Sequence, residues 1–372
     1  MAEKHINPTN HCPGSSKEWS MPQRFSETAI AASPRRRFLG QLAQMAVAGS
    51  LLETEGAGAN AFAGDIQPPA GRVRQRVLGK TGLKVSEIGF GGHSWSFKRL
   101  PDGRGGLRVM TLEEADRIIR LGLQMGVNFF DSCTPPAEHS VPGEIIKRLG
   151  KRHQIIVSAR CCHKMKGVPA DREEVYKFIE ERLKLWQTDY FDLLMLTNEV
   201  DDTPRSGYWE MSYCLEALEK VKRQGKIRFT GFGCHFTPEV YLEAIDKYGQ
   251  SFDVCSLPYN IRHRAAEKIM LAAERVGLGI VTIKAFARGE LLKDRDLRGK
   301  EAGLPRDLLA FVLEHELVDT CLCGVISEAE LRENLTASGM KLTPESHRRL
   351  GSLAAVSPCP GYRWLEESWR YA

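Results

Sequence analysis

The sequence predicts an α/β fold, a (β/α)8 TIM barrel with an N-terminal β-hairpin and an aromatic C-terminal tail. Short β-branched or apolar runs alternate with amphipathic helical patterns, and this alternation is typical of a parallel sheet covered by helices. Eight such runs are enough to close a barrel. They span residues 87–90, 128–131, 155–159, 191–196, 229–233, 254–257, 280–283 and 320–324.

Helical patterns lie between these runs, and several have recognisable ends. Thr111 precedes Glu114 and can cap a helix start, while Gly126 can end the same helix. Thr237 before Pro238 is a second capping pattern. The expected helices cover residues 112–125, 173–187, 214–224, 238–248, 265–276, 306–315 and 329–337.

Residues 1–63 have the order of an export signal. Arg35 and Arg36 form a twin-arginine pair, a short apolar stretch follows over residues 39–52, and Ala61-Phe62-Ala63 is a cleavage-site pattern. This order predicts export of the folded protein through the Tat translocase, to the periplasm or otherwise outside the cytoplasm. The alternative is a basic disordered leader on a cytoplasmic protein. The apolar stretch is too short to be a permanent membrane anchor.

The rest of the chain divides into a linker at 64–73, the barrel at 74–350 and a tail at 351–372. Several aromatic residues in the tail predict that it packs on the barrel. A net charge of +5 on 372 residues, without a basic stripe interleaved with aromatics, does not support nucleic-acid binding. Removing the leader removes Cys12 and leaves nine of the ten cysteines, so at least one thiol is free, ligand-bound or paired with a second chain.

The segment RVLGKTGLKVSEIGFGG at 76–92 resembles the N-terminal hairpin and first strand of the aldo-keto reductases. Similar stretches are GVNFFD at 126–131, LEALEKVKRQGKIRFTGFG at 215–233, FDVCSLPYN at 252–260 and GVISEAELREN at 324–334. The resemblance covers about residues 74–340. It implies a barrel that reduces the carbonyl of a small molecule with a nicotinamide hydride. A Tyr then protonates the carbonyl oxygen, Lys and Asp lower the pKa of that Tyr, and His orients the substrate.

Most of these catalytic positions have changed in this sequence. The resemblance places the Asp at Asp131, but the Tyr position is Pro136, the Lys position is Arg160 and the His position is Thr197. Arginine keeps the charge of lysine but does not release its proton. We expect Asp131 and Arg160 to form a buried ion pair that would hold the site geometry without proving activity.

Two histidines are candidate replacement acids. His163 and His235 each follow a strand end, and histidine titrates near neutral pH. Either could equally be a hydrogen-bonded loop histidine. Glu138 and His139 lie in the segment that has lost the Tyr, and we expect both to be solvated rather than catalytic.

The resemblance also implies a cofactor site. It places the cofactor-binding positions at Cys234, Ser256, Lys284, Glu330 and Asn334. Glu330 stands near the position of the adenosine phosphate, where a carboxylate would repel a 2′-phosphate. NAD is therefore favoured over NADP.

Residues at the carboxyl ends of the strands should converge on one mouth of the barrel. One interpretation is a soft transition-metal site, with Cys161 or Cys162, His163, Cys234 and His235 as ligands. The other is a set of buried thiols without a metal. The full set is His93, Asp131, Cys133, Arg160, Cys161, Cys162, His163, Thr197, Asn198, Cys234, His235, Cys255, Lys284 and Cys323.

Two functions follow from these patterns. The first is a divergent oxidoreductase that is exported folded, with a nicotinamide nucleotide and a small-molecule substrate. The second is a non-catalytic barrel that binds a small ligand or a soft metal at its mouth.

Overall fold

The computed structural model describes residues 72–96, 99–133, 135–163, 172–198, 212–233, 237–292 and 303–354. The predicted leader, nearly all of the linker and the tail beyond residue 354 lie outside these ranges, as do Cys234 and His235. Within them, no helix combines the length and the apolar character needed to cross a membrane.

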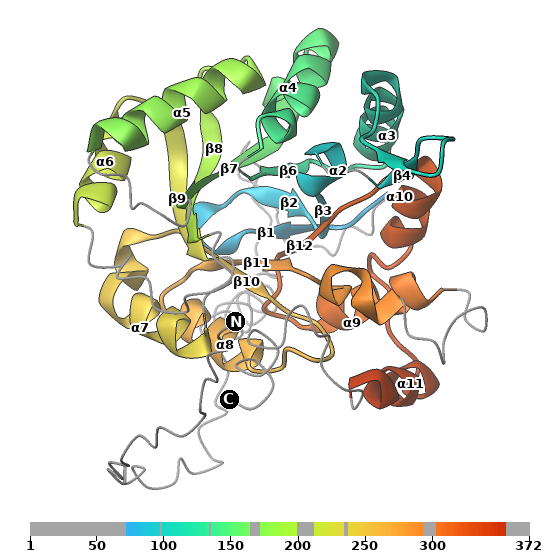
Figure 1. The fold of residues 1–372 in the computed structure, drawn as a ribbon. Coiled ribbons are helices and arrows are strands. Elements are labelled where there is room, and N and C mark those ends of the chain that lie inside the picture. Colours follow the sequence, from blue (N-terminus) through green and yellow to red (C-terminus); the bar gives the residue numbers. More distant parts are fainter. Residues whose placement is uncertain are drawn as a thin grey trace, which may run out of the picture. The chain divides into compact units, whose positions relative to one another are not determined.

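Eight parallel strands close into a barrel, as the sequence predicts (Figure 1). Their order around the barrel is β10-β11-β12-β3-β6-β7-β8-β9, and the closing pair places Cys321 of β12 opposite Ile88 of β3. The strands are β3 (Ile88–Gly91), β6 (Phe129–Ser132), β7 (Ile156–His163), β8 (Phe191–Asn198), β9 (Ile227–Gly233), β10 (Val254–Pro258), β11 (Gly279–Ile283) and β12 (Thr320–Cys323).

The predicted N-terminal hairpin consists of β1 (Gln75–Val77) and β2 (Lys84–Ser86), paired antiparallel. Leu78 and Val85 of this hairpin are fully buried and pack against Phe129 and Val254 of the barrel. The turn requires Gly79, which has a φ of +46° and lies so close to β11 that a Cβ would stand 2.2 Å from the backbone of Gly279. The hairpin therefore closes the N-terminal end of the barrel.

All seven predicted helices are present, with ends within two residues of those expected. Thr111 and Glu114 form the predicted capping box, and Gly126 is left-handed, as expected after a helix end. Thr237 occupies the N-cap of α7 with Pro238 in the first turn, as predicted, although its side chain makes no capping hydrogen bond. The helices are α3 (Leu112–Gln124), α5 (Arg172–Trp186), α6 (Ser212–Arg223), α7 (Pro238–Tyr248), α8 (Ala266–Arg275), α9 (Leu304–Glu314) and α10 (Glu328–Leu335).

Several elements were not expected from the sequence. The most important is α4 (Ala137–Leu149), which begins directly after Pro136 and contains Pro142. Prolines usually mark loops or helix breaks, so the pattern favoured a loop there. The others are α2 (His93–Ser96), the two-stranded sheet β4 (Leu100–Pro101) and β5 (Leu107–Arg108), and α11 (Pro344–Ala354).

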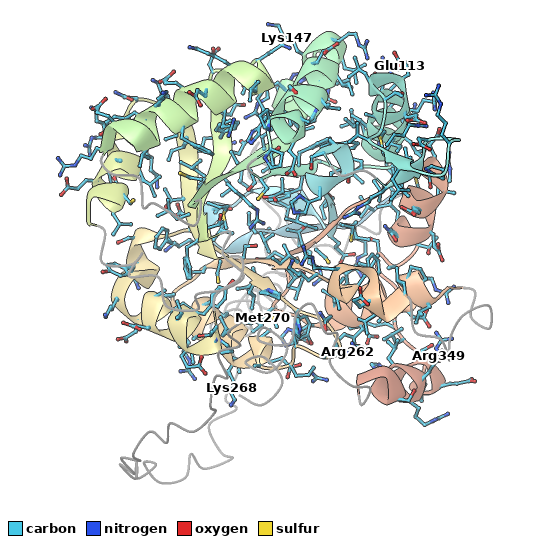
Figure 2. All side chains as sticks on the ribbon, in the orientation of Figure 1. Glu113, Lys147, Arg262, Lys268, Met270 and Arg349 are labelled. Atoms are coloured by element: carbon cyan, nitrogen blue, oxygen red, sulfur yellow. The ribbon has the colours of Figure 1, made fainter. Side chains whose placement is uncertain are left out.

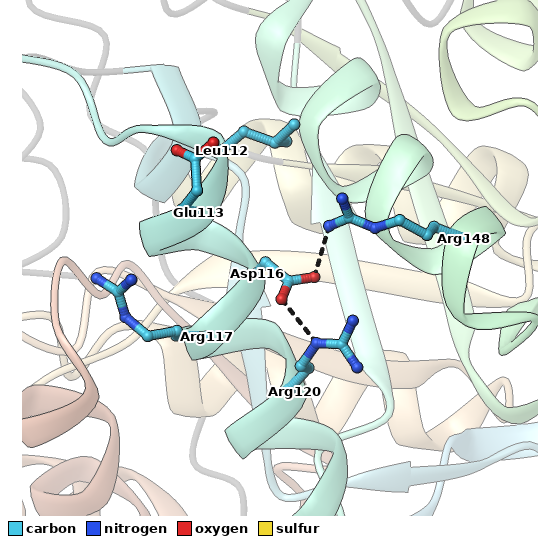
Figure 3. A pocket seen from close by; sticks show the side chains of 6 residues that line it. All are labelled: Leu112, Glu113, Asp116, Arg117, Arg120 and Arg148. Atoms are coloured by element: carbon cyan, nitrogen blue, oxygen red, sulfur yellow. Dashed lines mark hydrogen bonds and ion pairs between the residues drawn. The ribbon is translucent and has the colours of Figure 1, made fainter.

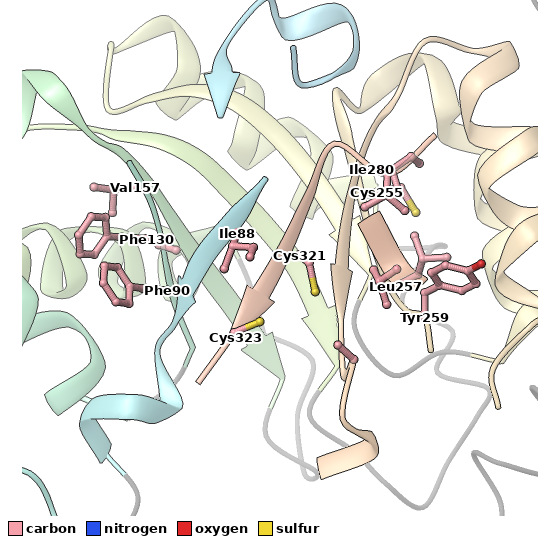
Figure 4. Close-up of a cluster of buried hydrophobic side chains, with 14 of the residues drawn as sticks. Ile88, Phe90, Phe130, Val157, Cys255, Leu257, Tyr259, Ile280, Cys321 and Cys323 are labelled. Carbon is pink, nitrogen blue, oxygen red and sulfur yellow. The ribbon is translucent and has the colours of Figure 1, made fainter. Parts of the chain in front are cut away.

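The core has two layers because side chains alternate along each strand. Phe129, Leu193 and Val254 fill the inside of the barrel, whereas Phe130 points outward and packs near Phe90 beneath the helices (Figure 4). Charged side chains such as those labelled in Figure 2, Glu113 of α3 and Lys147 of α4, lie on the outer surface of the helices. The alternation also decides which strand-end residues face the mouth of the barrel.

Candidate active site

A cavity of about 770 Å³ lies at the carboxyl ends of β3, β6, β7, β11 and β12. Its volume falls within the range of about 300–1,000 Å³ that is usual for ligand and cofactor sites. Active sites of (β/α)8 enzymes lie at this end of the barrel. The charged or titratable side chains that line it are His93, Arg99, Asp131, Cys133, Glu138, Arg160, Lys284, Arg288, Glu330 and Glu333.

Asp131 and Arg160 form the predicted buried ion pair. Arg160 Nε lies 2.7 Å from Asp131 Oδ2, and the two side chains are only 4% and 7% exposed. Ser158 donates its hydroxyl to Asp131 Oδ1 at 2.8 Å, and Arg160 Nη2 donates to Ser256 Oγ at 3.2 Å. These bonds hold the two charges in one geometry and connect β6, β7 and β10 across the barrel interior.

Ser256 was expected at the cofactor site. The structure buries it completely, and it does not line the cavity. Besides the contact with Arg160, its main-chain carbonyl accepts a hydrogen bond from the Tyr241 hydroxyl at 2.7 Å. Ser256 therefore supports the ion pair from below the cavity.

The expectation that Glu138 is solvated is wrong. Helix α4 carries this side chain over the end of β6, where it is 0% exposed yet borders the cavity. The nitrogen His93 Nδ1 donates to Glu138 Oε1 at 2.7 Å, and the Ser96 hydroxyl donates to the same oxygen at 2.6 Å. The backbone N–H of Cys133 donates to Glu138 Oε2 at 2.8 Å.

Two opposing effects act on the Glu138 carboxyl. Burial raises its pKa, but the hydrogen bonds and charge of His93, with those from Ser96 and Cys133, lower the pKa further than burial raises it. The net pKa lies below the ordinary value, so Glu138 is ionised at neutral pH. The mouth thus holds a buried carboxylate bonded to a histidine.

The position of Glu138 depends on Gly92. A Cβ at residue 92 would lie 2.2 Å from Glu138 Oε2 and 2.8 Å from the carbonyl oxygen of Asp131. Both distances are below any normal contact. Glycine is therefore required at the end of β3 for the carboxylate to approach this closely.

His139 was also expected to be solvated, and this is wrong too. The ring is fully buried, and its Nε2 donates to the carbonyl oxygen of Cys133 at 2.5 Å. Burial lowers the pKa of His139 to about 4. His139 is therefore neutral at physiological pH and fixes the backbone after β6.

The opposite end of the cavity is built by the segment after β11 and by α10. Lys284 and Arg288 both adopt left-handed backbone conformations, with φ of 64° and 60°. Asn260 Nδ2 donates to the carbonyl oxygen of Lys284 at 2.8 Å and so supports this conformation. Asn260 was not predicted as a site residue, although a polar residue soon after the β10 run was a usable signal.

Glu330 and Asn334 reach the same end of the cavity from α10. Glu330 Oε2 accepts the backbone N–H of Ile326 at 3.0 Å, and Ser327 Oγ accepts the N–H of Glu330 at 3.1 Å. The start of α10 is therefore already occupied by a carboxylate and a hydroxyl. Asn334 is only 4% exposed and faces the cavity.

The other predicted site residues either lie away from the cavity or fall outside the described ranges. Thr197 is fully buried in β8 and does not line the cavity. The described backbone of β7 pairs His163 with Asn198, and nothing more of the His163 side chain is described. Cys234 and His235 fall in the segment 234–236, which is not described.

The thiols that can be placed do not support the metal interpretation. Cys161 and Cys255 lie in the core between the barrel and the helices (Figure 4 labels Cys255). Burial raises the pKa of Cys161 to about 12 and raises that of Cys255 as well, so both remain protonated. The described ranges contain no group of three or more His, Cys, Asp or Glu side chains placed to hold a metal ion.

A second hollow of about 410 Å³ lies on the outer surface between α3 and α4 (Figure 3). Asp116 bonds Arg120 at 2.6 Å and Arg148 at 2.7 Å across it. Exposed ion pairs of this kind contribute little free energy. The hollow connects two neighbouring helices and contains no further group that points to a ligand.

Comparison with known proteins agrees with this architecture. The profile of the Aldo/keto reductase family matches residues 87–307. An L-galactose dehydrogenase of Arabidopsis thaliana is 24% identical over 298 residues, which cover 72% of this chain and 88% of that protein. The aldo-keto reductase YhdN of Bacillus subtilis is 27% identical over 207 residues, 52% of this chain and 56% of that protein.

Solved structures show the same fold. An aldo/keto reductase of Klebsiella pneumoniae in complex with NADP and acetate has a TM-score of 0.59 at 20% identity, covering 76% of this chain and 96% of that one. An aldo-keto reductase of Bacillus halodurans in its holo form also has a TM-score of 0.59, at 24% identity, and covers 78% of this chain and 100% of that one. With the family profile matching more than half of its length, the chain belongs to the aldo/keto reductase family.

Proposed function

We propose that this protein is an oxidoreductase that interconverts the carbonyl and alcohol forms of a small molecule with a nicotinamide nucleotide. The observation that carries the proposal is the cavity at the carboxyl ends of the strands, which joins an end lined by Lys284, Arg288 and Asn334 to the end that holds the buried Asp131–Arg160 pair. The family membership favours this function over a non-catalytic binding barrel.

The cavity suits a nucleotide in size and chemistry. Lys284 and Arg288 offer positive charge for phosphate groups, and the amide of Asn334 offers hydrogen bonds for a base. When bound, a nicotinamide nucleotide would supply or accept the hydride.

We infer that NAD is favoured over NADP. Glu330 and Glu333 both border the cavity, so a 2′-phosphate placed near them meets like charge. The contact of Glu330 with the Ile326 N–H also takes up a backbone donor at the start of α10. A second anion would therefore have to displace this carboxylate.

The chain's own residues then define what happens at the catalytic end. The guanidinium of Arg160 places a fixed positive charge near a substrate oxygen, where it stabilises negative charge that develops on that oxygen. Asp131 orients this guanidinium and balances its positive charge. Because arginine does not give up its proton, the proton must come from another residue.

Nucleotide binding tests the proposal directly. NADH and NADPH are titrated into the purified protein while the nicotinamide fluorescence is recorded, and we expect tighter binding of NADH. Glu330→Arg should raise the affinity for NADPH. Glu328→Gln is the matched control, because Glu328 lies on the same helix and pairs with Arg117 away from the cavity.

Turnover is then measured with L-galactose and NAD⁺, and with small aldehydes and NADH. L-galactose is chosen because the Arabidopsis relative is an L-galactose dehydrogenase. If neither nucleotide binds to the wild-type protein, the proposed function is wrong.

We also propose that the protein is exported through the Tat translocase and cleaved after Ala63, because Arg35 and Arg36 precede an apolar stretch and an Ala-x-Ala pattern. Tat carries folded proteins, which would suit a barrel that already holds a nucleotide. Replacing both arginines by lysine should leave the uncleaved precursor in the cytoplasm. Normal processing of that variant would contradict the proposal.

A further inference from the structure

We propose that His93, held by Glu138, is the residue that donates and accepts the proton at the substrate oxygen, in place of the missing phenol. This inference rests on the proposed oxidoreductase function. It concerns two residues that come from different elements, α2 and α4, and meet only in the folded barrel.

The geometry is that of a carboxylate–histidine pair at the wall of a cavity. His93 is 45% exposed at its side chain and lines the cavity together with Asp131 and Arg160, whereas Glu138 is 0% exposed. Because Nδ1 of His93 is bonded to Glu138, proton exchange with a substrate would use Nε2 on the other side of the ring. Orientation of one ring nitrogen by a buried carboxylate is a recurrent arrangement for acid–base histidines.

Glu138 is held in place more firmly than a surface partner would be. The Ser96 hydroxyl and the Cys133 N–H bind its two oxygens, and Gly92 leaves room for them. The bonds from His93 help to keep the carboxylate ionised.

The other titratable groups around His93 are less suited to this role. Asp131 is bonded to Arg160 and Ser158, and Arg160 stays protonated. His139 is buried and neutral. Cys133 and Arg99 border the same cavity as His93.

The proposed step transfers one hydride and one proton to the substrate. In the reducing direction, the carbonyl carbon gains a hydride from the reduced nicotinamide nucleotide, and the carbonyl oxygen gains the Nε2 proton of protonated His93. The C=O π bond becomes an alcohol, the nucleotide leaves oxidised, and neutral His93 takes up a proton from water. In the reverse direction, neutral His93 accepts the proton of the alcohol.

The test compares His93→Gln and Glu138→Gln with the wild type. His153→Gln is the matched control, since His153 is an exposed histidine that precedes β7 at the opposite end of the barrel. NADH binding, measured by nicotinamide fluorescence, should be unchanged in all three variants. Turnover of a small aldehyde with NADH should fall by about 10²–10⁴-fold in His93→Gln and stay at the wild-type level in His153→Gln.

Two further measurements separate catalysis from structure. Glu138→Gln keeps the shape of the side chain beside His93 Nδ1 but removes its negative charge, so the turnover number should fall while the KM for the aldehyde stays near its wild-type value. Glu138→Asp restores the carboxylate and should recover more of the turnover number than Glu138→Gln does.

The outcomes distinguish the two proposals. Failure of the wild-type protein to bind either nucleotide would overturn the proposed function and the acid role with it. Nucleotide binding with full turnover in His93→Gln would overturn only the acid role. A turnover number in Glu138→Gln equal to that of the wild type would overturn the role of Glu138.

Discussion

Removal of the Arg160 side chain is expected to cost the barrel a large part of its stability. In Arg160→Leu the carboxylate of Asp131 stays buried at 7% exposure and loses the guanidinium 2.7 Å away. Ser256 Oγ, which is fully buried, loses its donor in the same change. Breaking a buried pair from one side typically costs about 3–5 kcal/mol. At about 2 °C of melting temperature per kcal/mol for a domain of this size, the expected loss is about 6–10 °C.

The assay is urea unfolding followed by circular dichroism, with thermal melting as a second measure. Two controls separate charge from packing. Arg160→Lys keeps a positive charge near Asp131 and should lose less stability, and the double variant Asp131→Leu with Arg160→Leu should recover much of the loss because no charge is left unpaired. An Arg160→Leu protein within about 1 kcal/mol of the wild type would refute the reasoning.

Three further predictions concern the same region. Gly92→Ala should lower the free energy of unfolding by about 1–3 kcal/mol because its Cβ would collide with Glu138, whereas Gly351→Ala, with open space around it, should be close to neutral in thermal melting. The pKa of Glu138 is lower in the folded protein than its ordinary value of 4.5. The free energy of unfolding of the wild type should therefore exceed that of Glu138→Gln by its full amount at neutral pH, and this excess should shrink as the pH falls through the folded pKa. An excess that grows in acid would contradict this. Burial raises the pKa of Cys161 to about 12, so this thiol should resist iodoacetamide at about pH 8 in the folded protein, while the partly exposed Cys133 is labelled. Mass spectrometry of the peptides measures both, and equal labelling would contradict the burial of Cys161.

Most of the fold could be predicted because its signals are local. Alternating apolar runs mark the strands, and caps such as the Thr111–Glu114 pair mark helix starts. Helix α4 was missed since Pro136 and Pro142 resemble loop signals, yet Pro136 precedes the first helical residue and Pro142 is buried in the helix. Packing against the barrel outweighs the poor local propensity there.

The catalytic end could be predicted only in part. The Asp131–Arg160 pair was expected because Asp131 ends one predicted strand, Arg160 directly follows the next, and the two have opposite charges; the structure extends β7 to His163 and still forms the pair. The side chain of the adjacent Cys161 points to the opposite face of β7 and is buried under the helices. Two neighbours in the sequence therefore do not both belong to the site.

The sequence by itself predicted the barrel, the order of its eight strands and seven of the helices that alternate with them. These follow from short-range patterns and from residue identity. Only the tertiary structure decided that Glu138 is buried and bonded to His93, that His139 is neutral, and that Ser256 lies beneath the cavity. Burial and hydrogen bonding of a polar side chain depend on atoms from distant segments, such as Gly92 and Ser96 around Glu138, and a local pattern contains no information on how closely those atoms approach.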